Sequence, residues 1–107
     1  MAGKLYKNKY TKDDLVKVEN YIGRNAIELF IEIWTDRDGD GDVYPIQVTS
    51  LASAINILLK YYDSLSSYTD RCAELIMRDK SQEFITIYHV ERNREGLTYE
   101  VLRLAIQ

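Results

Sequence analysis

A period-two alternation of side chains constrains the fold of this chain more than any other feature. In AIELFIEIW, residues 26–34, three aliphatic residues alternate with acidic and aromatic ones: Leu29, Ile31 and Ile33 against Glu28, Phe30, Glu32 and Trp34. Successive side chains of a β-strand point to opposite faces of a sheet. The segment therefore predicts a strand that buries its aliphatic face.

An aspartate-rich stretch, residues 35–42, follows this strand and leads into a second one at 43–48. Asp38-Gly39 or Asp40-Gly41 supplies the residue types of a tight hairpin turn. Pro45 cannot donate a backbone hydrogen bond, so the returning strand is predicted to lie at the edge of the sheet or to carry a bulge.

A second hairpin is predicted near the C-terminus, from residues 83–90 and 97–105 around a turn at Asn93–Gly96. Together the two hairpins predict a four-stranded antiparallel sheet covered by helices on one face. The residues expected to face the helices are Ile31, Ile33, Ile85, Ile87, Leu102 and Leu104.

Three helices are predicted from capping patterns and hydrophobic stripes. Thr11 and Asp14 form a capping box, which predicts a helix over about 12–22 that ends at Gly23. Residues 50–65 carry apolar side chains at helical spacing and predict a second helix. Ser67 and Asp70 repeat the capping-box spacing and predict a third, ending near residue 80, with Cys72, Leu75 and Ile76 inward.

The expected fold is therefore α+β with the order αββααββ. One domain is expected over residues 11–107, preceded by a disordered basic arm, residues 1–10.

The chain contains 107 residues and one cysteine, Cys72, which excludes an internal disulfide framework. The cysteine is expected to be a small buried hydrophobic residue, and a reducing cytoplasm is the expected compartment. The apolar runs are too short for a helix that spans a bilayer.

Charge is unevenly distributed along the chain. Residues 1–12 carry four lysines and no acid, whereas residues 13–42 carry nine acids and three basic residues. An acidic region binds phosphate backbones poorly, so direct nucleic-acid binding is not expected. Such a region is suited either to a basic surface on another protein or to solvation alone.

The segment from Asp36 to Asp42 also suggests calcium. It places aspartates at loop positions one, three, five and seven and a glycine at six, as in the opening of an EF-hand loop. Position twelve is Gln47 instead of the bidentate glutamate, and a strand precedes the loop instead of a helix. Calcium ligation by Asp36, Asp38, Asp40 and Asp42 is therefore an alternative to a solvated acidic turn.

Strand alternation further predicts an aromatic face on the side of the sheet away from the helices. Its members are Phe30, Trp34, Tyr44, Phe84, Tyr88 and Tyr99. Exposed apolar patches of this kind mark interaction sites, although the middle helix or the N-terminal arm is an alternative cover for them. A one-residue change of register exchanges the two faces of a strand, so the assignment depends on the pairing.

The sequence offers few routes to catalysis. His89 and Glu91 form an H-x-E pair, but no P-C-x-x-C follows it, so the zinc-deaminase pattern is incomplete. One histidine and one cysteine leave little scope for nucleophilic catalysis, and no phosphate-binding glycine loop is present. A protein without enzymatic activity and without a required cofactor is favoured.

The leading hypothesis is a small acidic protein that binds another macromolecule, as an inhibitor of the immunity or phage anti-defence type, opposing a basic surface. The residues expected to bind the partner are Glu28, Phe30, Glu32, Trp34, Asp36, Asp38, Asp40, Asp42, Tyr44, Tyr88 and Tyr99. Two alternatives stand beside it. One is a module stabilised by calcium, and the other is a homo-oligomeric assembly subunit, such as a homodimer, that uses the aromatic face.

Overall fold

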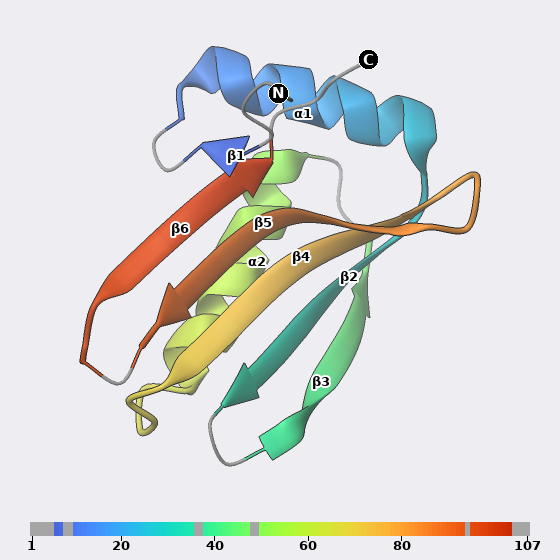
Figure 1. The fold of residues 1–107 in the computed structure, drawn as a ribbon. Coiled ribbons are helices and arrows are strands. Elements are labelled where there is room, and N and C mark those ends of the chain that lie inside the picture. The colour runs from blue at the N-terminus through green and yellow to red at the C-terminus, as the bar shows by residue number, and fades with distance from the viewer. Residues whose placement is uncertain (1–5, 8–9, 36–37, 48–49, 94, 104–107) are drawn as a thin grey trace, which may run out of the picture.

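One antiparallel sheet organises the molecule in the computed structural model, which describes residues 6–7, 10–35, 38–47, 50–93 and 95–103 (Figure 1). Within these residues the elements are β1 (Tyr6–Lys7), α1 (Lys12–Asn25), β2 (Ala26–Thr35), β3 (Asp38–Ile46), α2 (Leu51–Ser64), β4 (Arg71–Asp79), β5 (Phe84–Arg92) and β6 (Thr98–Arg103). The six described strands are ordered β1-β6-β5-β4-β2-β3, and every neighbouring pair is antiparallel. The predicted α+β class is confirmed, but the strand count and the element order differ from the prediction.

The first helix begins as its sequence predicts. The Thr11 hydroxyl accepts a hydrogen bond from the Asp14 backbone N–H at 3.2 Å, and the Asp14 carboxylate accepts one from the Thr11 N–H at 2.9 Å. Both bonds satisfy N–H groups that a helix leaves without internal partners. Gly23 does not end the helix, which continues to Asn25 and is followed directly by β2.

The second helix, α2, covers one face of the sheet (Figure 1). Ser50 caps it, and the predicted stripe of Leu51, Ile55, Leu58 and Tyr62 is buried. These side chains pack against strand residues that share the covered face, among them Ile31, Leu75 and Met77. Helix α1 packs against α2 and β2 at one end of the sheet.

The predicted third helix is wrong, because residues 71–79 form the strand β4. β4 lies between β2 and β5, so the two hairpins do not join directly as predicted. Its residues Ala73, Leu75 and Met77 are fully buried toward the helices, and Cys72 and Ile76 are also buried. A strand buried on both faces lacks clear alternation, and Ala, Leu and Met are good helix formers. The position of β4 at the centre of the sheet overrides this local preference.

A β-bulge changes the predicted faces of β5. Leu75 pairs with Tyr88 and the next residue, Ile76, pairs with Thr86, so Ile87 is an extra residue in β5. As a result Ile87 and Tyr88 are both buried, and Tyr88 is 0% exposed. The prediction of Tyr88 on the open face is therefore wrong. Its hydroxyl donates to Glu100, and its ring contacts Tyr10 edge to face.

β3 is the edge strand that Pro45 predicts, and the β5–β6 turn contains Gly96 with a φ of +83°. Within the predicted basic arm, Tyr6–Lys7 pairs with β6 as β1. Leu104 lies outside the described residues. Neither helix in the described part of the chain is long and apolar enough to cross a membrane.

Candidate functional site on the open sheet face

The face of the sheet opposite α2 carries the candidate site. Cross-strand partners share a face, so the pairing of β2 with β4 assigns its members. No described helix covers this face (Figure 1). From β2, β4, β5 and β6 it includes Glu28, Phe30, Glu32, Trp34, Cys72, Glu74, Ile76, Arg78, Phe84, Thr86, His89, Glu91, Tyr99 and Val101.

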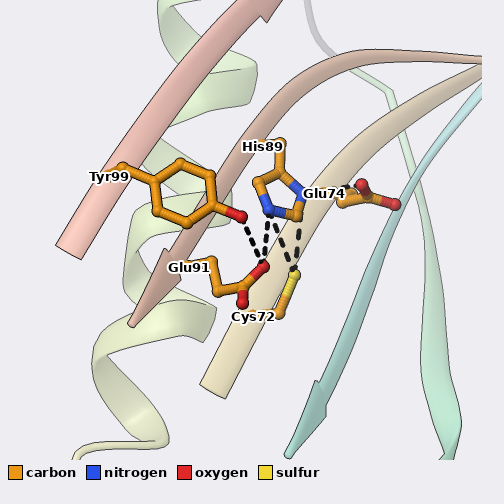
Figure 2. Close-up of polar contacts among 5 residues, drawn as sticks. All are labelled: Cys72, Glu74, His89, Glu91 and Tyr99. Atoms are coloured by element: carbon orange, nitrogen blue, oxygen red, sulfur yellow. Dashed lines mark hydrogen bonds and ion pairs between the residues drawn. The ribbon is translucent and has the colours of Figure 1, made fainter. Parts of the chain in front are cut away.

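A polar cluster lies on this face, on the two central strands β4 and β5 (Figure 2). Cys72 and Glu74 come from β4, and His89 and Glu91 come from β5. Because residues two apart on a strand share a face, each strand contributes both of its side chains to the same side. The register then sets Cys72 opposite Glu91 and Glu74 opposite His89.

His89 connects the members of the cluster. Its Nδ1 lies 2.6 Å from Glu74 Oε2, and its Nε2 lies 3.0 Å from Glu91 Oε1. The Cys72 Sγ lies 3.7 Å from Nδ1 and 3.8 Å from Nε2. Tyr99 of β6 donates its hydroxyl to Glu91 Oε1 at 2.9 Å, and its ring centroid lies 5.6 Å from that of His89. Figure 2 shows all five side chains converging in front of the sheet.

The carboxylates control the protonation of the cluster. The hydrogen bond to Glu74 raises the pKa of His89, and Glu91 raises it further, whereas burial opposes both effects. The cationic imidazolium is therefore favoured between two carboxylates. The hydrogen bond to Glu91 likewise raises the pKa of Tyr99.

The Cys72 thiol is poorly suited to act as a nucleophile. Its side chain is buried, at 3% exposure, and burial raises its pKa well above the ordinary value. The neighbouring charges of Glu74 and Glu91 raise the pKa further. Reactive cysteines need a cationic environment that stabilises the thiolate, and this site is acidic instead. The raised pKa keeps the thiol protonated at neutral pH.

The same groups are suited to binding a cation. Cys72, His89 and Glu91 bring one sulfur, one nitrogen and one oxygen ligand atom within 4.8 Å of one another. A cleft of about 140 Å³ opens beside two of them and is lined by Trp34, Thr35, Asp70, Arg71, Cys72 and Glu91. Solvent or a ligand can therefore approach the sulfur from this side.

Comparison with known proteins adds no assignment to this geometry. No family model, curated protein or solved structure matches the chain.

The predicted acidic partner surface is divided between the two faces of the sheet. Glu28 and Glu32 lie on the open face, and Glu28 accepts a hydrogen bond from Arg78 Nε at 3.0 Å. Asp42 pairs with Ile33, whose side chain is on the covered face, so Asp42 projects to that side and is exposed there. Asp36 and the side chains of Asp38 and Asp40 lie outside the described part of the structure.

The aspartate segment does not form the predicted turn. Thr35 pairs with Asp38, and residues 38–46 are the strand β3, so neither Asp38-Gly39 nor Asp40-Gly41 is the hairpin turn. An EF-hand loop needs a tightly turned backbone, which residues 38–42 do not have. Calcium binding by the four aspartates stays a prediction.

The predicted aromatic face is smaller than expected. Tyr44 stacks on Tyr61 of α2, with ring centroids 4.4 Å apart, so it belongs to the covered face together with Tyr88. Phe30, Trp34, Phe84 and Tyr99 remain on the open face. Phe30 and Phe84 contact each other edge to face at 5.8 Å.

The sequence prediction did not identify the polar cluster. It included His89 and Glu91 as an H-x-E pair, but it placed Cys72 in a helix and gave Glu74 no role. The signal that was available is the matching C-x-E pattern at residues 72–74. Two such patterns on adjacent strands bring four polar side chains together on one face.

Proposed function

We propose that this protein is a non-enzymatic binding protein whose open sheet face receives a basic surface of another protein. The observation that carries the proposal is a broad sheet face that no described helix covers (Figure 1). A face of this kind, rich in large side chains, is typical of an interaction surface.

The charges on the face support a basic partner. Four acidic residues, Glu28, Glu32, Glu74 and Glu91, share it with only Arg78 and His89 among the described side chains. Two of these carboxylates already contact His89, and Glu28 contacts Arg78. Glu32 therefore contributes negative charge without a basic contact among the described ion pairs. Electrostatic complementarity of this kind selects a partner and accelerates encounter.

Apolar side chains supply contact area around these charges. Phe84 is 65% exposed and Tyr99 is 45% exposed, and Val43 of the edge strand is also exposed beside Glu32. Aromatic residues contribute strongly to protein interfaces because they bury a large area with few rotatable bonds. By size and acidity, the chain fits an inhibitor that occupies a basic groove, such as an immunity or phage anti-defence protein.

Charge reversal on the open face tests the proposal. The partner is isolated by cross-linking in the cells that express the protein, and binding of the purified pair is then measured as a function of salt. The double variant Glu28→Lys/Glu32→Lys is expected to weaken binding about tenfold or more and to flatten its salt dependence. The control Asp13→Lys/Asp63→Lys makes the same change in net charge at exposed helix positions and is expected to bind nearly as the wild type does.

Equal losses in both double variants, or no loss in either, would contradict recognition by the open face.

Two further measurements test the aspartate segment and self-association. Replacing Asp36, Asp38, Asp40 and Asp42 with asparagine tests whether the aspartate segment contributes to binding. Sedimentation over a dilution series tests self-association, and a dimer that Phe84→Ser dissociates would replace the proposal with a homo-oligomeric function.

A further inference from the structure

We propose that Cys72, His89 and Glu91 form a transition-metal site, for which Zn²⁺ is the best-matched ion. The three residues supply a thiolate, an imidazole and a carboxylate, which are the ligand types that Zn²⁺ binds in proteins. This site is separate from the aspartate segment, and it lies within the open face to which the protein partner is proposed to bind.

The distances between the ligand atoms suit tetrahedral coordination. Bond lengths of about 2.0–2.3 Å place neighbouring ligand atoms of a tetrahedral zinc site about 3.3–3.8 Å apart. Sγ of Cys72 lies 3.8 Å from His89 Nε2, and Nε2 lies 3.0 Å from Glu91 Oε1. All three ligand atoms lie within 4.8 Å of one another, and an ion between them requires Sγ, which is almost equidistant from the two ring nitrogens, to turn toward Nε2.

Glu74 orients the histidine for this role. Its carboxylate lies 2.6 Å from His89 Nδ1, which occupies that nitrogen and leaves Nε2, beside Glu91, for the metal. A metal-bound histidine commonly donates its second N–H to a carboxylate in this way. The Tyr99 hydroxyl similarly holds the Glu91 carboxylate from the opposite side (Figure 2).

The surroundings favour a cation and leave one coordination position open. Carboxylates surround the sulfur, and a divalent ion relieves their mutual repulsion. On binding, the ion replaces the proton of the Cys72 thiol and the proton on His89 Nε2, and both protons pass to solvent. The adjacent cleft of about 140 Å³ has room for a water molecule as the fourth ligand.

The ligands also come from the two central strands of the sheet. Cys72 lies on β4, and His89 and Glu91 lie on the adjacent strand β5, both of which are paired on two sides. Side chains fixed by a sheet interior hold their positions better than side chains on loops. The cluster is therefore arranged before the metal arrives.

Titration with Zn²⁺ and with Co²⁺ tests the proposal on reduced protein without a polyhistidine tag. One Zn²⁺ per chain is expected to bind, with a rise in melting temperature. Co²⁺ is expected to give a thiolate-to-cobalt charge-transfer absorption together with intense visible bands of tetrahedral coordination. The charge-transfer absorption reports sulfur ligation, which distinguishes this site from any binding at the aspartates.

Variants assign the ligands. Cys72→Ser is expected to abolish the charge-transfer absorption, and Glu91→Gln is expected to weaken Zn²⁺ binding at least about tenfold. Glu74→Gln is expected to weaken binding about 10–100-fold while the charge-transfer absorption remains. The control Glu28→Gln removes a carboxylate from the same face away from the cluster and is expected to leave binding unchanged.

Absence of a sulfur-ligated Co²⁺ spectrum at millimolar metal would overturn the proposal, as would full Zn²⁺ affinity in Glu91→Gln. Circular dichroism verifies that each variant is folded. If Cys72→Ser does not fold, the half-exposed position Glu91 decides the test, because its replacement by glutamine preserves shape and the hydrogen bond from Tyr99.

Discussion

At the scale of single residues, neighbouring charges decide what the side chains of the open face can do. The thiol of Cys72 is buried among carboxylates, which raise its pKa and suppress its nucleophilicity. The same carboxylates raise the pKa of His89 and favour its charged form. The environment therefore opposes catalysis by a thiolate and favours binding of a cation. Cysteine and histidine as residue types can serve either role, and here the neighbouring carboxylates decide between them.

Backbone conformation at two glycines gives a prediction at this scale. Gly96 has a φ of +83°, and an added Cβ would lie 3.2 Å from the Arg92 guanidinium, so Gly96→Ala is expected to lower the free energy of unfolding by about 1–3 kcal/mol. Gly23 lies in α1 with open space around it, so Gly23→Ala is expected to raise the free energy of unfolding by about 0.5–1 kcal/mol. Denaturant unfolding measures both. Effects of the same sign would contradict the assigned conformations.

At the scale of elements, the central strand β4 determines how the two predicted hairpins are used. β4 pairs with β2 on one side and with β5 on the other, so it joins the β2–β3 hairpin to the β5–β6 hairpin. The pairing also brings Cys72 and Glu74 beside His89 and Glu91. A helix at this position would have removed both the joined sheet and the polar cluster.

Hydrogen exchange of the backbone amides tests the position of β4. Its amides in residues 72–77 are expected to exchange more slowly than those of β3, residues 42–46, because β4 is paired on both sides and β3 is an edge strand. Mass spectrometry with peptide-level resolution is sufficient for this comparison. Faster exchange in β4 than in β3 would contradict the strand order.

At the scale of the whole molecule, one hydrophobic core joins both helices to the sheet. Val18 of α1, Leu58 of α2 and Leu75 of β4 belong to the same buried cluster. The open face contributes little to this core, so its polar and aromatic residues are available for binding. This separation of a stabilising face from a binding face is the basis of the proposed function.

A core substitution tests whether the molecule unfolds as one unit. Leu58 is 0% exposed, and Leu58→Ala is expected to lower the free energy of unfolding by about 2–5 kcal/mol. Helix and tertiary signals are expected to be lost together, because the helices and the sheet share the core. Asn56→Ala, at an exposed position on the same helix, is the matched control and is expected to change stability by less than about 0.5 kcal/mol.

The sequence by itself determined the elements whose signals are local. The capping box at Thr11 and Asp14, the stripe from Leu51 to Tyr62, and the alternation in residues 26–34 each predict an element that is present. Pro45 is also a local signal. Proline has no backbone N–H to donate to a second neighbouring strand, so it predicts the edge position that β3 occupies. In each case the interactions that favour the element involve residues close together in the sequence.

Only the tertiary structure decided the identity of β4, the burial of Tyr88 and the composition of the open face. Residues 71–79 are a strand because two partner strands flank them, and the bulge at Ile87 changes which side of β5 faces the core. The cluster of Cys72, Glu74, His89 and Glu91 exists because pairing aligns two strands that are separate in the sequence. Cross-strand register is a property of long-range contacts, and local patterns of side chains do not contain it.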